Sequence, residues 1–276
     1  MLDINVVIVN YKMRSDIERC LSGLLADLEE SRLKAAVQVM DNSKNVDGVK
    51  ELIKTKYPSV YYYDCGGNIG FGKAQNIGLK RVEAKFYLPL NPDIVFPARK
   101  MALRRLVDYL ENNPQVGVVA PKLFNSDGSL QYSCCRFPLF LDQIARRLEL
   151  NRCFSYFQKR VDYYLMKDFN HQDSVPVDWV IGSFMLIRQE AALKVGFFDE
   201  RFFMYFEDCD LCRRMWRSGW EVHYVAEVAL IHGHRRDSAQ FNPLFSLLAN
   251  PVARIHLKSW WQYFRKWGIK KEHFGI

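Results

Sequence analysis

The chain has 276 residues, 49% of them hydrophobic and 14% aromatic, which is enough to bury the core of one large domain or two small ones. No apolar run reaches the roughly 20 residues that span a bilayer, and the start, MLDINVVIVNYK, lacks the basic segment and cleavage site of a signal peptide. The seven cysteines include an adjacent pair and one C-x-x-C, Cys209 to Cys212, without the second ligand pair of a zinc site. We therefore expect a cytoplasmic protein without structural disulfides.

The first half of the chain alternates between two patterns. Short apolar segments rich in β-branched and aromatic residues suit strands that are buried on both faces; they are INVVIVN, AVQVMD, SVYYYD, FYLPLN and VGVVAP. The stretches between them have helical spacing, at 14–30, 46–56, 72–83 and 99–112. This alternation predicts an α/β fold with a mostly parallel central sheet flanked by helices.

After Pro121 the rhythm changes. LFNSDGSLQYS places an Asp-Gly pair between strand-like flanks, which predicts a β-hairpin. Further predicted elements are helical spacing over 139–170, a strand in VPVDWVIGSFMLIR, a helix in EDCDLCRRMWRSG and a last pair of short strands in WEVHYVAEVALIHGH. Because no linker or repeat interrupts the chain, we expect one domain over 1–238, with halves 1–121 and 122–238, and a helical extension over 239–276.

The stretch YYDCGGNIGFGKAQN raises the question of a phosphate site. Gly67 to Lys73 fits G-x-x-x-x-G-K, the start of a P-loop, but Ala74 stands where that motif needs a Mg²⁺-binding Ser or Thr. A dinucleotide fingerprint fits poorly too, because the third glycine does not follow Gly72 at the required spacing. Two interpretations remain: a tight turn without a ligand, or a glycine-rich loop whose backbone N–H groups approach an anion at a helix N-terminus.

Polar side chains follow three of the predicted strands. They are Asn10 and Tyr11, Asp41 and Asn42, and Asn91 and Asp93. Ligands bind beyond the carboxyl ends of parallel strands, so we expect these side chains to converge on one crevice. Asp41 is suited to accept a hydrogen bond from the imide N–H of a uracil or thymine, Tyr11 to pack on that base, and Asp93 to hold a divalent cation against a diphosphate.

A resemblance to a known family covers most of residues 4–234. In chain order, VIVNY, DNS, GNIGFGKAQN, LNPD, DWVIGSFMLIRQEAALKVGFFDERFFMYFEDCDLCRR and IHGH resemble bacterial family-2 glycosyltransferases of the GT-A fold. Within that family they resemble the rhamnosyltransferases that build the O-antigen of lipopolysaccharide and related polysaccharides. The resemblance implies that 1–121 is the nucleotide-sugar-binding half and 122–238 the acceptor and catalytic half.

The resemblance also implies roles for single residues. The donor nucleotide-sugar is expected along Asn10, Tyr11, Asp41, Asn68, Gly70, Gly72, Lys73 and Asn91. A Mg²⁺ or Mn²⁺ ion is expected at Asp93, which ends a short D-x-D motif whose first acid is replaced by Asn91, and at His232. The alternative for His232 is a structural partnership with a nearby carboxylate.

Three acids fall within one predicted helical turn, where mutual repulsion can keep a carboxylate basic near neutral pH: Glu207, Asp208 and Asp210. Acids at a helix N-terminus are also ordinary caps. The resemblance singles out Asp208 as the general base. It places Trp179, Gly182 and Glu207 on the acceptor side, although Trp179 fits a hydrophobic core nearly as well.

Together these features predict an inverting, metal-dependent glycosyltransferase. The resemblance implies dTDP-L-rhamnose as the donor, with a polyprenyl-diphosphate-linked sugar at the inner membrane face or a growing polysaccharide as the acceptor. The alternatives are another donor such as a UDP-hexose, a sugar nucleotidyltransferase, which also combines a base-binding strand end with a metal-binding acid, and a non-catalytic binding protein.

The extension carries most of the charge. Residues 241–276 hold six cations and one acid, against a net charge of +8 for the whole chain. Within it Leu257, Trp260, Trp261, Phe264 and Trp267 recur at three- and four-residue steps, the spacing of one helical stripe. A basic helix with such a stripe lies in the membrane interface, so we expect peripheral attachment to an anionic membrane surface and no nucleic-acid partner. The alternative is that the helix packs on the domain or forms a dimer contact.

Overall fold

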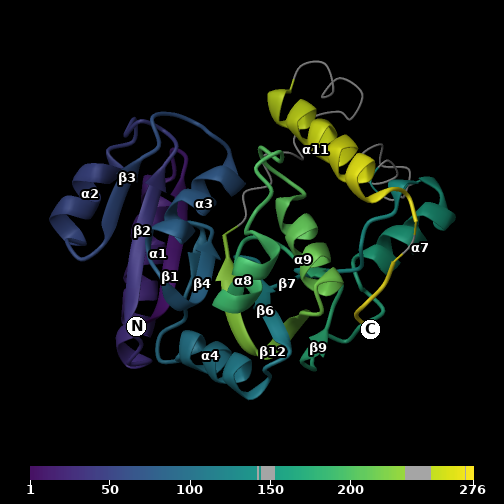
Figure 1. The fold of residues 1–276 in the computed structure, drawn as a ribbon, viewed down its shortest axis with the longest axis horizontal. Helices are drawn as coiled ribbons and strands as arrows, with labels where there is room; N and C mark the ends of the chain where they lie inside the picture. Colours follow the sequence, from purple (N-terminus) through teal and green to yellow (C-terminus); the bar gives the residue numbers. More distant parts are fainter. Residues whose placement is uncertain (142, 144–152, 234–249, 271) are drawn as a thin grey trace.

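The computed structural model describes residues 1–141, 143, 153–233, 250–270 and 272–276, and its centre is a single mixed sheet. The main strands lie in the order β3-β2-β1-β4-β11-β6-β12-β5, between two groups of helices (Figure 1). Their bounds are β1 Leu2–Asn10, β2 Ala35–Asp41, β3 Tyr61–Asp64, β4 Ala84–Leu90, β5 Ile94–Val95, β6 Val116–Phe124, β11 Leu186–Arg188 and β12 Glu221–His232. The sheet thus runs through both halves of the chain.

The direction of the strands brings their polar ends together. β3, β2, β1 and β4 are parallel neighbours, and β6 runs parallel to β12, while β11 lies antiparallel between β4 and β6. Asn10 and Asp41 are register partners at the ends of β1 and β2. The prediction of a mostly parallel α/β sheet is confirmed, and the carboxyl ends of its strands share one edge.

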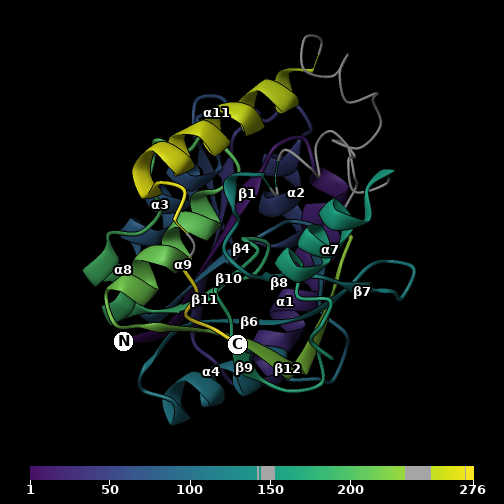
Figure 2. The same cartoon turned by 90° about the vertical axis from the view of Figure 1, so that its right-hand side faces the viewer.

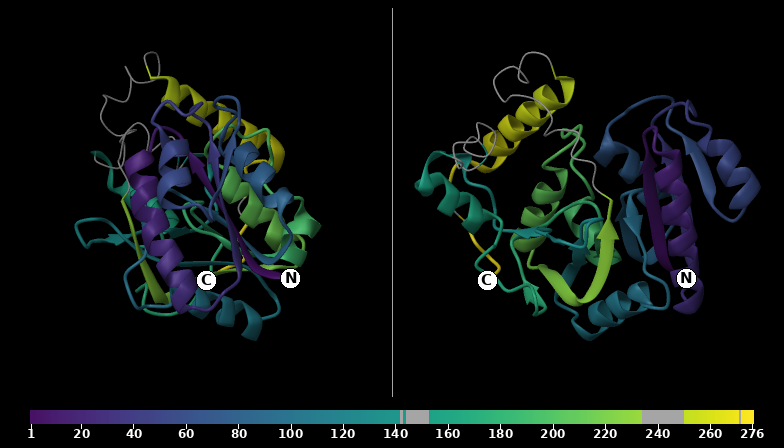
Figure 3. Two further views of the ribbon diagram at one scale, coloured as in Figure 1. Left: turned by 90° about the vertical axis from the view of Figure 1, so that its left-hand side faces the viewer. Right: turned by 180° about the vertical axis from the view of Figure 1, so that it is seen from behind.

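Helices cover both faces of the sheet, as the two views of Figure 3 show. One apolar cluster joins the sheet to α1 (Arg14–Glu30), α2 (Val49–Lys56) and α4 (Ala102–Asn112). The other joins it to α3 (Phe71–Arg81), α8 (Gln189–Val195) and α9 (Glu207–Arg217). The helices expected in the first half of the chain are all confirmed, because their apolar residues at helical spacing are the ones buried against the sheet.

The second half was harder to predict. The hairpin is confirmed, since β7 (Leu130–Gln131) pairs antiparallel with the end of β6. The expected last pair of strands is instead the one long strand β12, whose bulge after Val225 interrupts the alternation of the sequence. The expected strand over 175–188 is three pieces, β9 (Val175–Pro176), β10 (Trp179–Val180) and β11. It breaks because β10 leaves the main sheet to pair with β8 (Cys134–Cys135).

The extension begins with α11 (Pro251–Trp267), which lies over α9 in both Figure 1 and Figure 2. Tyr263 and Phe264 are buried, and the Trp260 ring lies 4.4 Å from the ring of Phe140, whereas Trp261 is 54% exposed. Most of the predicted apolar stripe therefore packs on the domain, as the structural alternative proposed. In the described part of the chain, no helix is long and apolar enough to cross a membrane. The part of the extension over 239–249 lies outside the described residues.

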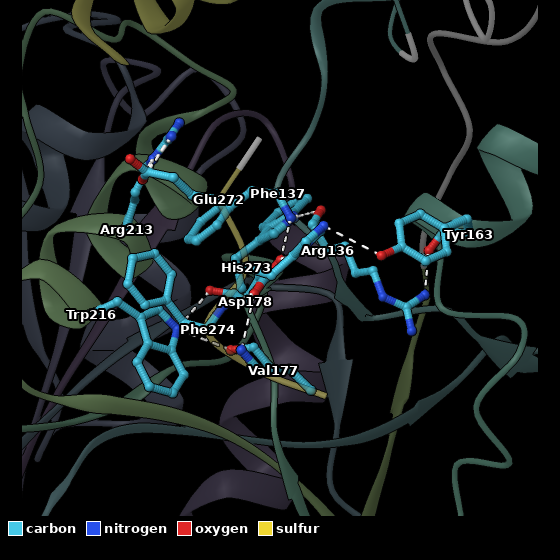
Figure 4. Close-up of polar contacts among 12 residues, drawn as sticks. Arg136, Phe137, Tyr163, Val177, Asp178, Arg213, Trp216, Glu272, His273 and Phe274 are labelled. Carbon is cyan, nitrogen blue, oxygen red and sulfur yellow. Dashed lines mark hydrogen bonds and ion pairs between the residues drawn. The ribbon is translucent and has the colours of Figure 1, made fainter. Parts of the chain in front are cut away.

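Beyond α11 the chain runs back along the domain and is held at Asp178 (Figure 4). This carboxylate is buried and accepts hydrogen bonds from the N–H groups of Phe137, Phe274 and Gly275 and from the ring of His273. The Phe274 ring stacks on Trp216 at 5.5 Å and 12°. The extension is thus fixed to residues of the second half of the chain at two places, by α11 and by the segment after it.

Candidate active site

The ends of β1 and β2 form a hydrogen-bonded cluster. The Asn10 amide donates to Asp41 at 3.0 Å and to Asp47 at 3.1 Å. Asp41 is fully buried and also accepts from the hydroxyl groups of Ser43 and Tyr62 and from the N–H groups of Ser43 and Asn45. Burial opposes ionisation, but these donors outweigh it and hold the pKa of Asp41 below its usual value.

Both oxygens of Asp41 are thus occupied by the protein's own donors, which order the loop that follows β2. Its direct contact with a nucleobase stays a prediction. Tyr11 lies at the same edge and is 47% exposed, with the Lys12 ammonium 5.5 Å from its ring, so its ring is accessible to a ligand. Asp47, which binds the same amide as Asp41, was not picked out from the sequence.

The glycine-rich loop joins this edge to the second half of the chain. Gly70 has φ +95°, and a Cβ there would lie 2.7 Å from the Phe203 carbonyl oxygen, so only glycine fits. The Phe71 N–H at the start of α3 donates to that carbonyl at 2.8 Å, and Gly70 donates to the Asn68 side chain at 3.2 Å. Two N–H groups of the loop are therefore used inside the protein, while Lys73 is exposed on the first turn of α3.

Asp93 and His232 meet where β4 and β12 end. His232 Nε2 lies 3.1 Å from Asp93 Oδ1, and both side chains are buried. His232 Nδ1 lies 2.9 Å from Gln131 Oε1, so Nδ1 carries the hydrogen and Nε2 faces the carboxylate. The described residues contain no cluster of three or more His, Cys, Asp and Glu suited to a metal ion. The pair offers one oxygen and one nitrogen ligand, and also forms the carboxylate partnership that was the alternative for His232.

The candidate base sits after a strained turn. Tyr205 and Phe206, just before α9, have φ of +72° and +67°, which is unusual for aromatic residues and common at active sites. Asp208 then accepts the Gly182 N–H on Oδ2 and the Cys209 N–H on Oδ1, both at 2.7 Å. A Cβ at Gly182 would lie 3.3 Å from Asp208 Oδ2, so the missing side chain leaves room for this approach. The structure thus brings Asp208, the predicted base, into contact with Gly182 of the predicted acceptor side.

Burial raises the pKa of the two acids at the start of α9, Asp208 and Glu207. It raises the pKa of Asp208, against the effect of the Gly182 and Cys209 N–H groups. Burial raises the pKa of Glu207 well above the ordinary carboxyl value, with the negative charge of Asp208 as the next cause. A carboxylate with a raised pKa is a stronger proton acceptor, which suits a general base.

The side chains of Asp210 and Trp179 are held by hydrogen bonds to other parts of the protein. Asp210 is fully buried and accepts from the Trp267 ring N–H at 2.8 Å, from Lys266 at 2.6 Å and from Arg214 at 2.8 Å. Trp179 is 8% exposed and donates from its ring to the Arg136 carbonyl at 2.9 Å. A role of Trp179 on the acceptor side stays a prediction, and its place in the structure is that of a core side chain.

Hydrogen bonds connect the segment before Asp93 to the segment that binds Asp208. The Asn91 N–H donates to the Ser183 carbonyl at 2.8 Å, next to the Gly182 that binds Asp208. Along these elements, buried atoms without a hydrogen-bond partner in the described residues are Asn42 Oδ1, the Gln75 amide, Ser183 Oγ and Glu207 Oε2. Such atoms cost about 1–3 kcal/mol each when unsatisfied, so each of them is a candidate for contact with a ligand or with water. Gln75 and Ser183 were missed, and only their place inside quoted motifs marked them in the sequence.

Comparison with known proteins shows the family of the chain. The chain matches the model of a family described as "Glycosyltransferase like family 2" over residues 3–267. It is 30% identical over 270 residues to Rhamnosyltransferase WbbL of Escherichia coli K12, covering 95% of this chain and 92% of that protein. It is 27% identical over 285 residues to the N-acetylglucosaminyl-diphospho-decaprenol L-rhamnosyltransferase of Mycobacterium tuberculosis, covering 96% and 88%.

Solved structures share the fold at low identity. GalNAc-T7 with UDP, GalNAc and Mn²⁺ has a TM-score of 0.63 and 14% identity, covering 96% of this chain and 48% of that one. The mannosyltransferase PcManGT from Pyrobaculum calidifontis, in complex with GDP-Man and Mn²⁺, has a TM-score of 0.57 and 16% identity, covering 86% and 60%. The chain thus spans about half to three-fifths of these structures and has the GT-A fold that they share. With the match over residues 3–267, it belongs to the family-2 glycosyltransferases.

Proposed function

We propose that the protein is an inverting rhamnosyltransferase, which moves L-rhamnose from dTDP-L-rhamnose to a lipid-linked sugar in the biosynthesis of a cell-surface polysaccharide of the O-antigen type. The observation that carries the transfer is Asp208, a carboxylate with a raised pKa, held by two N–H groups behind a strained turn. The names of the two relatives support the sugar and the lipid-linked acceptor.

Asp208 acts as the base. Its carboxylate takes the proton from an acceptor hydroxyl as that oxygen forms a bond to the anomeric carbon of rhamnose. The bond from that carbon to the diphosphate breaks on the opposite face, and dTDP leaves, so the configuration inverts. The Gly182 and Cys209 N–H groups hold the carboxylate in place while its charge changes.

Asp93 and His232 are the proposed metal ligands. The Gln131 contact fixes the His232 ring with Nε2 toward Asp93, which is the arrangement of a ligand pair supported by a neighbouring side chain. Asp93 and His232 would hold a Mg²⁺ or Mn²⁺ ion, and its other ligands would come from the donor and from water. A bound cation neutralises the charge of the leaving diphosphate.

A donor screen tests the proposal. Purified protein is incubated with a short prenyl diphosphate carrying N-acetylglucosamine and with dTDP-rhamnose, UDP-glucose, UDP-galactose or UDP-GlcNAc, and the free nucleotide is measured. We expect release of dTDP from dTDP-rhamnose and a product one rhamnose heavier. Turnover with a UDP-sugar alone would overturn the donor assignment, and release of pyrophosphate in a parallel reaction with dTTP and a sugar 1-phosphate would indicate a nucleotidyltransferase.

The same assay tests the metal. Excess EDTA should abolish turnover, and Mg²⁺ or Mn²⁺ should restore it. Asp93→Ala should weaken dTDP binding chiefly when the cation is present, as measured by calorimetry. Full turnover in excess chelator would show that protein groups, rather than a cation, neutralise the diphosphate.

A further inference from the structure

The outer face of α11 is distinct from the face that packs on the domain. The exposed residues after the first residue of the helix are Arg254, Lys258, Trp261 and Arg265. At about 100° per residue these four positions fall within an arc of about 60°. Ser259 and Tyr263, which are buried, point to the opposite side. We call the four exposed residues the outer face of α11.

Among the described residues, no acidic side chain pairs with the cations of this face. From Pro251 to Trp267 the helix contains no acid. In the part of the chain that the structure describes, Lys266 on the flank pairs with Asp199 and Asp210, and no ion pair involves the three cations of the outer face. The Arg265 guanidinium lies 5.1 Å from the centre of the Trp261 ring, so an exposed aromatic ring is bracketed by cations.

We propose that the outer face of α11 binds the surface of an anionic bilayer. Tryptophan prefers the membrane–water interface, where lipid phosphates are close enough to bind cations on either side of its ring. One exposed indole between cations therefore suits this interface. A stable protein partner would need a broad apolar centre of contact, and one Trp among three cations does not supply it. This face is not the stripe suggested by the sequence spacing, because Trp260, Phe264 and Trp267 turn toward the domain.

The packed face of the same helix reaches the catalytic segment. The Ser259 hydroxyl donates to the Met204 carbonyl at 2.8 Å, just before the strained turn. Lys266 and the Trp267 ring bind Asp210, two residues after the candidate base. Contact of α11 with a bilayer therefore holds Asp208 at a fixed height above the lipid. This use of the membrane rests on the proposed lipid-linked acceptor, whereas binding to the bilayer does not.

Flotation with vesicles tests the surface. The full chain is mixed at 0.1 M salt with vesicles of phosphatidylcholine containing about 30% phosphatidylglycerol, or of phosphatidylcholine alone. Each cation near an anionic surface strengthens binding about fivefold, so the triple variant Arg254→Gln, Lys258→Gln, Arg265→Gln should bind roughly 100-fold more weakly. The matched control is Lys54→Gln, Lys100→Gln, Arg105→Gln, which loses the same charge from exposed positions elsewhere and should bind like the wild type.

Further variants separate charge from insertion. Trp261→Ala should weaken vesicle binding several-fold while the melting temperature stays unchanged, because the side chain is exposed. Raised salt should release the wild type, since the Debye length falls below 10 Å. Equal binding of the two triple variants, or self-association of a wild type that ignores vesicles, would overturn the proposal.

Activity assays on two acceptors distinguish a failure of membrane binding from a failure of the proposed function. With a short water-soluble acceptor, the outer-face triple variant should turn over like the wild type. With a long-chain acceptor in anionic vesicles, it should be slower by at least about tenfold. If the wild type bound to vesicles but was inactive on both acceptors, the proposed function would be wrong. The proposal that α11 binds the membrane would still be supported.

Discussion

The two sides of the site treat carboxylates in opposite ways. On the proposed donor side, Asp41 receives N–H and O–H donors on both oxygens, which hold its pKa down. On the proposed acceptor side, Asp208 receives one N–H on each oxygen and burial raises its pKa, while Glu207 Oε2 has no hydrogen-bond partner among the described residues. An acid surrounded by donors maintains structure, and an acid left short of them can accept a proton. The surroundings in the fold, rather than the residue type, decide the role.

The largest expected effect is the loss of turnover when Asp208 is replaced. Asp208→Asn keeps the size and shape of the side chain and one of its two backbone hydrogen bonds, but it cannot accept a proton. We expect a loss of roughly 10²–10⁴-fold in kcat, with dTDP binding in calorimetry little changed. The control is Asp173→Asn, an exposed acid of the same half, which should keep full turnover. Near wild-type turnover by a folded Asp208→Asn protein would remove Asp208 from this role.

The pH profile of the wild type gives a second reading of the same carboxylate. Only the ionised form accepts a proton, so kcat falls as pH drops through the pKa of Asp208. Because burial raises that pKa, the acid limb should lie above the value of roughly 3.9 for a free aspartate. An acid limb at or below that value would contradict the raised pKa.

Substitution of Asp41 should chiefly lower the stability of the protein. Asp41→Ala leaves several buried donors without an acceptor, and unsatisfied groups cost about 1–3 kcal/mol each. We expect the free energy of unfolding to fall by about 3 kcal/mol in urea titrations. Asp64→Ala, at the exposed end of the neighbouring strand, should change it by less than about 0.5 kcal/mol. A stable Asp41→Ala protein that has lost only donor affinity would show that Asp41 is a ligand and not a scaffold.

Substitution of Glu207 should raise the stability of the protein, by less than the substitution of Asp41 lowers it. Its pKa is raised in the folded state, so the folded chain holds this proton more tightly than the unfolded chain, and stability falls as pH rises through that interval. Glu207→Gln removes the cost of a buried charge. We expect the variant to be more stable at pH 8 by about 1.4 kcal/mol for each unit of raised pKa, with no gain at pH 4. Thermal unfolding at the two pH values decides it, and equal gains at both would contradict the pKa argument.

The smallest effect is expected at Lys73. The side chain is exposed on α3, and the loop before it is held by backbone and Asn68 contacts. Lys73→Ala should therefore lower donor affinity only a few-fold in a dTDP titration. If it instead abolished an ATP hydrolysis activity of the wild type, the P-loop interpretation would have to be restored.

Local pattern determined much of the fold. Helical spacing gave α1 and α9, continuous apolar runs gave the parallel strands, and an Asp-Gly pair gave the hairpin, because each depends on neighbours close in sequence. The pattern failed where contacts are distant. The bulge in β12 and the exit of β10 toward β8 arise from strands far along the chain. The meeting of Asp93 with His232, 139 positions apart, was suggested by motif resemblance and not by spacing.

The sequence also determined that residues 253–267 form a helix with aromatic side chains, since periodicity alone defines the faces of a helix. It left open which face is buried. The tertiary structure decided this, because Asp210 binds Lys266 and Trp267, and Tyr263 fills the space beside Arg213, which turns Trp261 and three cations outward. The same holds for the acids. Their order along the chain is a sequence property, but whether each is satisfied or left to react depends on donors that folding brings from elsewhere.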